Sequence, residues 1–171
     1  MIERNLYILI GNIAAGKSTW LKSREIDRST GYKSKVIISR DNIRKQFAKS
    51  IGREYIYEEY LEKIIHSIIE EYTYGYCYIG TPNIFIDETN MTTSGRQMFI
   101  DIASDYGYKI TVVVFPDLGE DEHVRRRLLC NHGCELNDGL TEDLWRRVYR
   151  EKKDKYEEPT LEEGFDEIIY V

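Results

Sequence analysis

The chain has 171 residues, and its 24 lysines and arginines against 30 aspartates and glutamates give a formal net charge of -6. This length fits one domain over residues 1–171, and an acidic chain does not coat nucleic acid, so any contact with nucleic acid has to be local. Three cysteines, an odd number, favour reduced thiols over a disulfide framework. The first apolar run, residues 6–10, is far too short to span a bilayer or serve as a signal core, so we expect no membrane contact and a cytoplasmic location.

A glycine-containing stretch follows that run directly. Residues 11–19 read GNIAAGKST, which fits G-x-x-x-x-G-K-[ST] at every fixed position after a predicted buried strand. Such a loop lets successive backbone N–H groups converge on phosphate oxygens at the start of a helix. Lys17 adds a charge near the β- and γ-phosphates, and the Ser18 hydroxyl can bind Mg²⁺. The candidate nucleotide-binding residues are Gly11, Asn12, Ile13, Ala14, Ala15, Gly16, Lys17, Ser18 and Thr19.

The rest of the chain alternates between predicted helices and strands. Apolar periodicity and turn residues predict helices over about residues 17–25, 54–76, 94–106 and 121–129, and a last long helix with Thr141 as its N-cap. The predicted strands are residues 6–10, 35–39, 83–86, 109–115 and 168–171. The core-facing stripe of the second helix is expected to contain Tyr57, Tyr60, Leu61, Ile64, Ile65, Ile68, Ile69 and Tyr72. This order predicts an α/β fold, a three-layer α/β/α sandwich with about five parallel strands and its active edge at the carboxyl ends of the strands.

Charged residues follow the second and third predicted strands. Arg40, Asp41 and Arg44 come after the second strand, and the sequence DETN at residues 87–90 follows the third. Open α/β sheets bind their ligands at this edge. Asp41 is our candidate general base, because it lies one strand from the phosphate loop between arginines that can hold an anionic acceptor. The alternative makes Asp41 the N-cap of the helix after the second strand, and both roles are compatible.

The segment at about residues 125–141 lies between two predicted helices. The arginines at 125–127 either face phosphates or form a solvated helix face. The polar residues after them are predicted to form a mobile flap. A zinc clip made by Cys130, His132 and Cys134 is the less favoured alternative, because the spacing is unusual and a fourth ligand is missing.

A phosphate loop predicts nucleotide binding without naming the reaction. The sequence has no guanine-reading N/T-K-x-D motif and no room for a second motor domain, which favours a small phosphotransferase. The loop with its following Trp20, the R-D-x-x-R motif at 40–44 and the DETN motif at 87–90 resemble the corresponding motifs of the polynucleotide 5′-hydroxyl kinase family over most of the chain. This resemblance implies a P-loop nucleoside-triphosphate kinase fold with a helical lid at about 125–141.

The resemblance also implies roles for the motif residues. Lys17 and Ser18 would hold phosphates and Mg²⁺, Asp41 would take the proton of the acceptor hydroxyl, and Arg44, with Arg40 beside it, would bind the neighbouring phosphate of the acceptor. In the DETN motif, Asp87 would support the acceptor or the water shell of the metal, with Glu88 as an equally placed alternative, and Asn90 would lie on the substrate side.

The lid departs from the family pattern, because CNHG at 130–133 occupies the place of the family's second lid arginine. Arg126 is therefore the candidate catalytic lid residue, and Arg127 the candidate nucleotide contact. The leading hypothesis is an ATP- and Mg²⁺-dependent kinase that acts on the 5′-hydroxyl end of DNA or RNA. The alternatives are a kinase for a small-molecule, nucleoside or modified-base hydroxyl, and a nucleotide-dependent binding or regulatory ATPase. The oligomeric state stays open.

Overall fold

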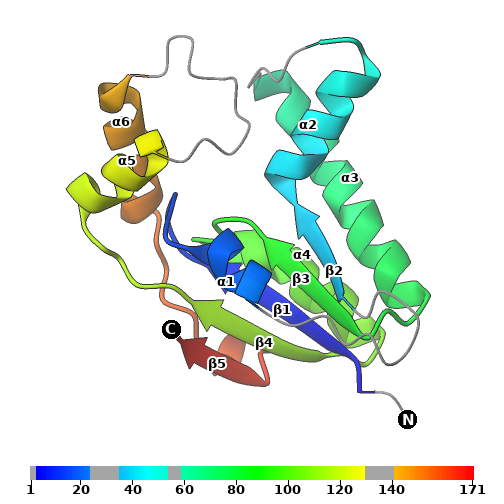
Figure 1. The fold of residues 1–171 in the computed structure, drawn as a ribbon. Helices are drawn as coiled ribbons and strands as arrows, with labels where there is room; N and C mark the ends of the chain where they lie inside the picture. The colour runs from blue at the N-terminus through cyan, green and yellow to red at the C-terminus, as the bar shows by residue number, and fades with distance from the viewer. Residues whose placement is uncertain (1–2, 24–34, 54–58, 130–140) are drawn as a thin grey trace.

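A computed structural model describes residues 3–23, 35–53, 59–129 and 141–171, and a five-stranded sheet forms its centre (Figure 1). The strands are β1 (Asn5–Ile10), β2 (Lys35–Ser39), β3 (Asn83–Asp87), β4 (Lys109–Val114) and β5 (Glu167–Tyr170). Their spatial order is β2-β3-β1-β4-β5, and each neighbouring pair is parallel. The five predicted strands are confirmed, each within one residue at either end.

The helices lie between these strands in the chain. They are α1 (Lys17–Ser23), α2 (Arg40–Ser50), α3 (Glu59–Tyr78), α4 (Thr93–Asp105), α5 (Glu120–Leu129), α6 (Glu142–Asp154) and the short 3₁₀ helix η1 (Leu161–Glu163). The predicted continuation of the first helix to residue 25 lies outside the described residues. None of the described helices is both long and apolar enough to cross a bilayer.

Both faces of the sheet are covered, because the side chains of β1 alternate between two apolar clusters. Leu6, Ile8 and Ile10 join the larger cluster, which contains residues of α2, α3 and α4. Leu9 joins the smaller cluster with Leu21 of α1 on the opposite face. The sheet therefore lies between two helical layers, and the predicted three-layer α/β/α arrangement is confirmed.

The buried side of α3 differs from the predicted stripe. Ile65 and Ile69 are buried as expected, and Thr73 and the free thiol Cys77 continue their row at four-residue steps. By contrast, the tyrosines and isoleucine at positions 60, 64 and 72 are exposed. The prediction was wrong at these three positions because the buried row at i, i+4, i+8 and i+12 is narrow and they lie beside it.

The carboxyl ends of the strands are flanked by two helical units. Figure 1 shows α2 and α3 on one side of this edge and the pair α5 and α6 on the other. Arg146 of α6 joins the pair through ion pairs with Glu120 and Asp121 of α5, at 2.9 and 2.7 Å. Thr141 caps α6 by accepting a hydrogen bond from the Leu144 N–H, which confirms its predicted role.

Buried Arg96 of α4 ties the turn after β3 to the C-terminal segment. Its guanidinium forms a 2.7 Å ion pair with Glu163 and donates a hydrogen bond to the Asn90 carbonyl oxygen at 3.0 Å. A buried charge needs such partners, because its desolvation is otherwise uncompensated. The contact therefore fixes the backbone at the end of the DETN motif, residues 87–90.

Candidate functional site

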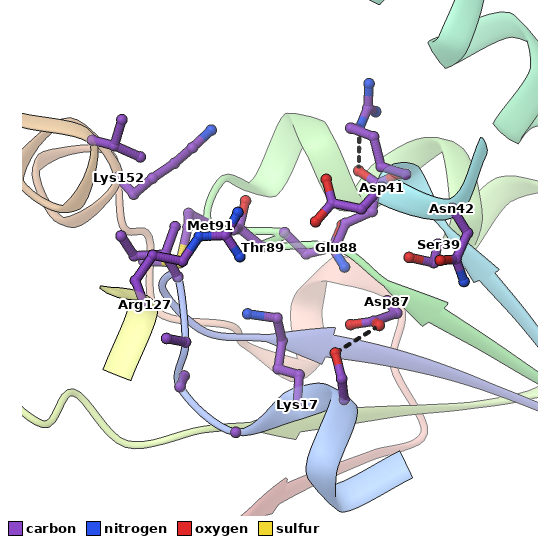
Figure 2. Close-up of a pocket in the computed structure, with 18 of the residues that line it drawn as sticks. Lys17, Ser39, Asp41, Asn42, Asp87, Glu88, Thr89, Met91, Arg127 and Lys152 are labelled. Carbon is purple, nitrogen blue, oxygen red and sulfur yellow. Dashed lines mark hydrogen bonds and ion pairs between the residues drawn. The ribbon is translucent and has the colours of Figure 1, made fainter. Parts of the chain in front are cut away.

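A pocket of about 1840 Å³ lies at the carboxyl edge of the sheet, between the phosphate loop, the start of α2, the end of β3 and the α5–α6 pair. Pockets for one small ligand measure roughly 300–1,000 Å³, so this space admits a nucleotide and a second substrate together. Figure 2 shows Lys17 at the base of the pocket, Arg127 and Lys152 on one side, and Asp41, Asp87 and Glu88 on the other. The structure therefore brings the predicted loop, acceptor and lid residues to one place.

The two glycines of the loop motif are required for different structural reasons. Gly16 has a φ of 104°, which an L side chain rarely adopts, so it supplies the turn into α1. Gly11 instead lies too close to its neighbours for a side chain, because a Cβ there would meet the Phe115 Cβ at 2.9 Å and the Ala15 Cβ at 3.2 Å. Sequence reasoning attributed the same curling role to both glycines, and only Gly16 has the backbone that requires it.

Lys17 is folded over its own loop. Its Nζ donates hydrogen bonds to the carbonyl oxygens of Gly11, at 2.7 Å, and Asn12, at 2.8 Å. Burial lowers the pKa of Lys17 to about 8; the charges of Asp87 and Asp41 oppose this shift and that of Arg127 adds to it. The ammonium group is thus within electrostatic reach of the candidate metal acid, the candidate base and the lid.

Ser18 and Asp87 form the candidate metal site. The Ser18 hydroxyl donates to the Asp87 carboxylate at 3.2 Å. Burial raises the pKa of Asp87, and the Lys17 charge and the Ser18 hydrogen bond act in the opposite direction. A hydroxyl and a carboxylate oxygen facing phosphate-binding backbone are a donor set that fits Mg²⁺, which keeps several waters and few protein ligands.

Asp41 lies in the first turn of α2, where Ser39 is the N-cap residue. The interpretation of Asp41 as N-cap is therefore wrong. Its carboxylate is about half exposed and forms a 2.7 Å ion pair with Arg44. A base must reach both the acceptor and solvent-borne protons, and this placement allows it.

Glu62 of α3 joins the two acceptor arginines and was missed by sequence reasoning. It accepts hydrogen bonds from Arg44 Nε at 2.8 Å and Nη2 at 2.7 Å, and from Arg40 Nη1 at 3.3 Å. Burial raises the pKa of Glu62, but these arginines outweigh burial and keep it below its ordinary value. Arg44 is thus held in place by carboxylates of α2 and α3. A helical position among ordinary surface charges carries no local signal for this contact.

The two acids at the end of β3, Asp87 and Glu88, have different partners. Asp87 faces Ser18, whereas Glu88 Oε2 pairs with Arg40 Nε at 3.0 Å. Glu88 Oε1 is buried and has no hydrogen-bond partner among the described residues. Asn90, predicted on the substrate side, is buried with a φ of 48°, and its Nδ2 donates to the Leu9 carbonyl oxygen at 2.9 Å. The Asn90 amide therefore holds β1 against the turn, and because Asn90 also lines the pocket, its contact with the substrate stays a prediction.

The lid arginines separate into two kinds. Arg125 and Arg126 both pair with Glu122 of α5, at 2.7 and 2.6 Å. Arg127 instead stacks on the Trp145 ring, 4.4 Å from its centroid, and its charge acts on Lys17. Arg127 is consequently better placed than Arg126 for a phosphate contact.

The predicted flap and its zinc alternative at residues 130–139 lie outside the described residues. Within the described ranges, no group of three or more His, Cys, Asp or Glu side chains is arranged to hold a metal ion.

Hydrogen bonds link the phosphate loop to α5 and α6, which are called the lid helices because they flank the predicted lid segment. His123 of α5 is fully buried, and its Nδ1 is 2.6 Å from the Ile13 carbonyl oxygen. Since a carbonyl only accepts, Nδ1 carries the hydrogen, and Nε2 accepts from the Leu118 N–H at 3.1 Å. Asn12 Nδ2 in turn donates to the Tyr149 carbonyl oxygen of α6 at 3.0 Å. The position of the loop thus depends on both lid helices.

Positive charge is concentrated in this pocket although the chain is acidic overall. Of the described residues, twelve basic side chains line it: Lys17, Lys22, Lys35, Arg40, Arg44, Lys45, Arg125, Arg126, Arg127, Arg147, Lys152 and Lys155. Five acidic ones do so: Asp41, Glu62, Asp87, Glu88 and Glu151. Such an excess raises the local concentration of anionic ligands. Sequence reasoning missed Lys152 in this set, because a lysine near the end of a polar helix has no distinguishing local pattern.

The sequence profile of a family described as an AAA domain, AAA_33, matches residues 6–159. The chain belongs to this family. The match includes the phosphate loop, both charged motifs and the lid helices, so the AAA_33 assignment covers every part of the pocket. No protein with a curated description matches this AAA_33 sequence.

Solved structures share the fold of this AAA_33 domain. A chain of the Pnkp1/Rnl/Hen1 RNA repair complex is 21% identical with a TM-score of 0.60, and the match covers 92% of this chain and 47% of that one. Kti12 of Chaetomium thermophilum, solved with ADP-AlF3, is 14% identical with a TM-score of 0.60, covering 97% and 88%. The Mycobacterium tuberculosis APS kinase CysC, solved with AMPPNP and APS, is 12% identical with a TM-score of 0.58, covering 99% and 90%.

These likenesses establish a P-loop kinase-like α/β fold. The AAA_33 domain spans about half the length of the RNA repair chain that it matches. The AAA_33 family is thus a broader class than the polynucleotide 5′-hydroxyl kinases that the motifs resemble, and the comparisons establish only the broader class.

Proposed function

We propose that this protein is an ATP- and Mg²⁺-dependent kinase that transfers the γ-phosphoryl group to a hydroxyl, most specifically the 5′-hydroxyl end of DNA or RNA. The observation that carries the proposal is the position of Asp41. Its carboxylate acts electrostatically on both Lys17 and Asp87 across one pocket. A base, a phosphate-binding cation and a metal acid at one sheet edge are the parts that phosphoryl transfer to an alcohol needs.

Bound ATP with Mg²⁺ supplies the phosphoryl group and offsets the charge on its oxygens. Ser18 and Asp87 would hold the ion, and Lys17 would exchange its loop carbonyls for phosphate oxygens. Asp41 takes the proton of the acceptor hydroxyl as the acceptor oxygen bonds to phosphorus and the bond to the β-phosphate oxygen breaks. Arg127, whose charge reaches Lys17, stabilises the charge that develops on the phosphoryl oxygens.

Two features favour a nucleic-acid end as the acceptor. The excess of basic side chains in the pocket suits a polyanion that enters locally. Arg40 and Arg44 lie beside Asp41, where a phosphate next to the acceptor hydroxyl would lie. The likeness to a chain of an RNA repair complex agrees with this acceptor, although it establishes only the fold.

An acceptor assay tests the proposal. The protein is incubated with γ-labelled ATP, Mg²⁺ and 5′-hydroxyl DNA or RNA oligonucleotides, and the labelled ends are resolved on a gel. We expect label on 5′-hydroxyl ends and none on oligonucleotides that already carry a 5′-phosphate. A folded, nucleotide-binding protein that labels neither polymer would refute the nucleic-acid acceptor.

A small-molecule acceptor is the second candidate. It is favoured by the match to APS kinase, which covers nearly all of both chains, whereas the match to the RNA repair chain covers half of that chain. The same labelled ATP with a panel of nucleosides, sugars and small phosphorylated alcohols distinguishes the two. Label on one of these compounds, with oligonucleotides inert, would select the second candidate.

A further inference from the structure

Lys152 is a cation inside the pocket that forms no ion pair with a carboxylate of the described residues. It lies in the last part of α6, is half-buried, and lines the pocket. Figure 2 shows its side chain extending from the lid side toward the side of Asp41 and Glu88. Among the described residues it has no hydrogen-bond or ion-pair partner, whereas the adjacent Lys153 pairs with Asp117 at 2.8 Å.

The charges near Lys152 place it on the acceptor side. Burial lowers the pKa of Lys152, and the positive charges of Lys155, Arg40 and Arg44 lower it further, whereas the charge of the adjacent Glu151 opposes the shift. Lys17, in contrast, is influenced by Asp87, Asp41 and Arg127. Lys152 therefore interacts with the cations at the start of α2, whereas Lys17 interacts with Arg127.

Lys152 lies outside the ion pairs that the arginines at the start of α2 form. Arg40 and Arg44 have partners in the carboxylates of Asp41, Glu62 and Glu88, but Lys152 adds a further positive charge to the same space. Clustered like charges repel unless a negative group lies between them. A phosphate accepts several charge-assisted hydrogen bonds at once, from a lysine as well as from guanidinium groups.

We infer that Lys152 binds a backbone phosphate of the acceptor strand, opposite Arg40 and Arg44, so that the lid helix α6 and α2 grip the acceptor from two sides. The inference rests on the proposed nucleic-acid acceptor and adds a contact that none of the sequence motifs contains. Because Lys152 belongs to α6, acceptor binding joins the lid side of the pocket to the side that carries the base.

Steady-state kinetics of Lys152→Gln test the contact. We expect the KM for a 5′-hydroxyl hexanucleotide to rise about tenfold, because a hydrogen bond to a charged group is lost. The KM for ATP should stay at the wild-type value. Lys152→Arg retains the charge and should stay within about threefold of wild type for both substrates. Lys49→Gln, on an exposed lysine of α2 that does not line the pocket, is the matched control and should change neither constant.

Binding measured without turnover separates this inference from the reaction. A 3′-fluorescent 5′-hydroxyl oligonucleotide is titrated with protein in the presence of AMPPNP at several salt concentrations. Lys152→Gln should weaken binding about tenfold and reduce the log–log salt slope by about one.

An increase in the KM for ATP alone would place Lys152 on the donor phosphates and overturn the inference, as would unchanged oligonucleotide binding. If wild-type protein labels no nucleic-acid end, the proposed function fails, and the binding titration still decides the role of Lys152.

Discussion

Two charged side chains of the pocket, Asp41 and Lys17, differ in how far they are withdrawn from water. Asp41 is half exposed and paired with Arg44, whereas Lys17 is drawn out of water over its loop. An exposed ion pair contributes little to stability, about 0–1 kcal/mol. Asp41 is therefore placed for chemistry at little structural cost, while the protonation of Lys17 depends on its surroundings.

Asp41→Asn removes the proposed base without removing its bulk. We expect kcat for phosphoryl transfer to fall by about 10²–10⁴-fold, the usual contribution of a general base. The dissociation constant for AMPPNP should change by less than about threefold, because Asp41 contacts neither the loop backbone nor Ser18. Single-turnover transfer and equilibrium binding measure the two quantities. Retention of wild-type transfer would exclude Asp41 as the base.

The lowered pKa of Lys17 predicts a pH-dependent nucleotide affinity. Below about 8 the ammonium is charged and affinity should be constant; above that value the charge is lost, and affinity should weaken by up to about tenfold per pH unit. Lys17→Arg keeps its charge at these pH values and should remove the dependence. Binding of AMPPNP between pH 7 and 9.5 tests this, and equal pH profiles for the two proteins would contradict it.

The folding stability of the ligand-free protein depends on pH in the opposite direction: the contribution of Lys17 rises with pH, whereas its contribution to nucleotide affinity falls. Unfolded Lys17 holds its proton up to its ordinary pKa of 10.5, and folded Lys17 up to about 8. The unfolded state therefore binds more protons between these values, so the contribution of Lys17 to stability rises with pH there.

At the scale of elements, the lid helices and the phosphate loop are one connected unit. His123 of α5 donates a hydrogen bond to the Ile13 carbonyl oxygen of the loop, and Asn12 of the loop donates one to the Tyr149 carbonyl oxygen of α6. The side chains of both donors are buried. A buried donor or acceptor that loses its partner costs about 1–3 kcal/mol. Lid position and loop conformation should consequently change together.

His123→Ala tests that connection. It leaves the Ile13 carbonyl and the Leu118 N–H without their partner, so we expect a loss of about 2–4 kcal/mol of unfolding free energy and weaker nucleotide binding. His123→Asn retains a donor near the Nδ1 position and should lose less of both. Urea unfolding and AMPPNP titration provide the measurements. Weakened folding with unaltered nucleotide affinity would limit His123 to a packing role.

For the whole molecule, the contrast between an acidic chain and a basic pocket predicts how it meets a polyanion. Its formal net charge is -6, while its pocket collects basic side chains. Contact with nucleic acid should therefore involve about two or three phosphates, not a long track. The log–log salt slope for a single-stranded 5′-hydroxyl oligonucleotide should be about -1.5 to -2, and lengthening the strand from 6 to about 20 nucleotides should not steepen it. A slope that grows with length would indicate a wider binding surface.

Local patterns in the sequence determined the strands, the phosphate loop and the edge where the site lies. Short apolar runs and a glycine-containing loop encode these features in consecutive residues. Only the tertiary structure decided that Asp87 faces Ser18 whereas Glu88 pairs with Arg40, and that Arg127 stacks on Trp145. It also revealed Glu62 and Lys152 in the pocket. Each of these choices depends on partners from segments distant in the chain, such as Ser18 with Asp87. Burial and charge at such a position are set by packing between elements, which no short run of residues contains.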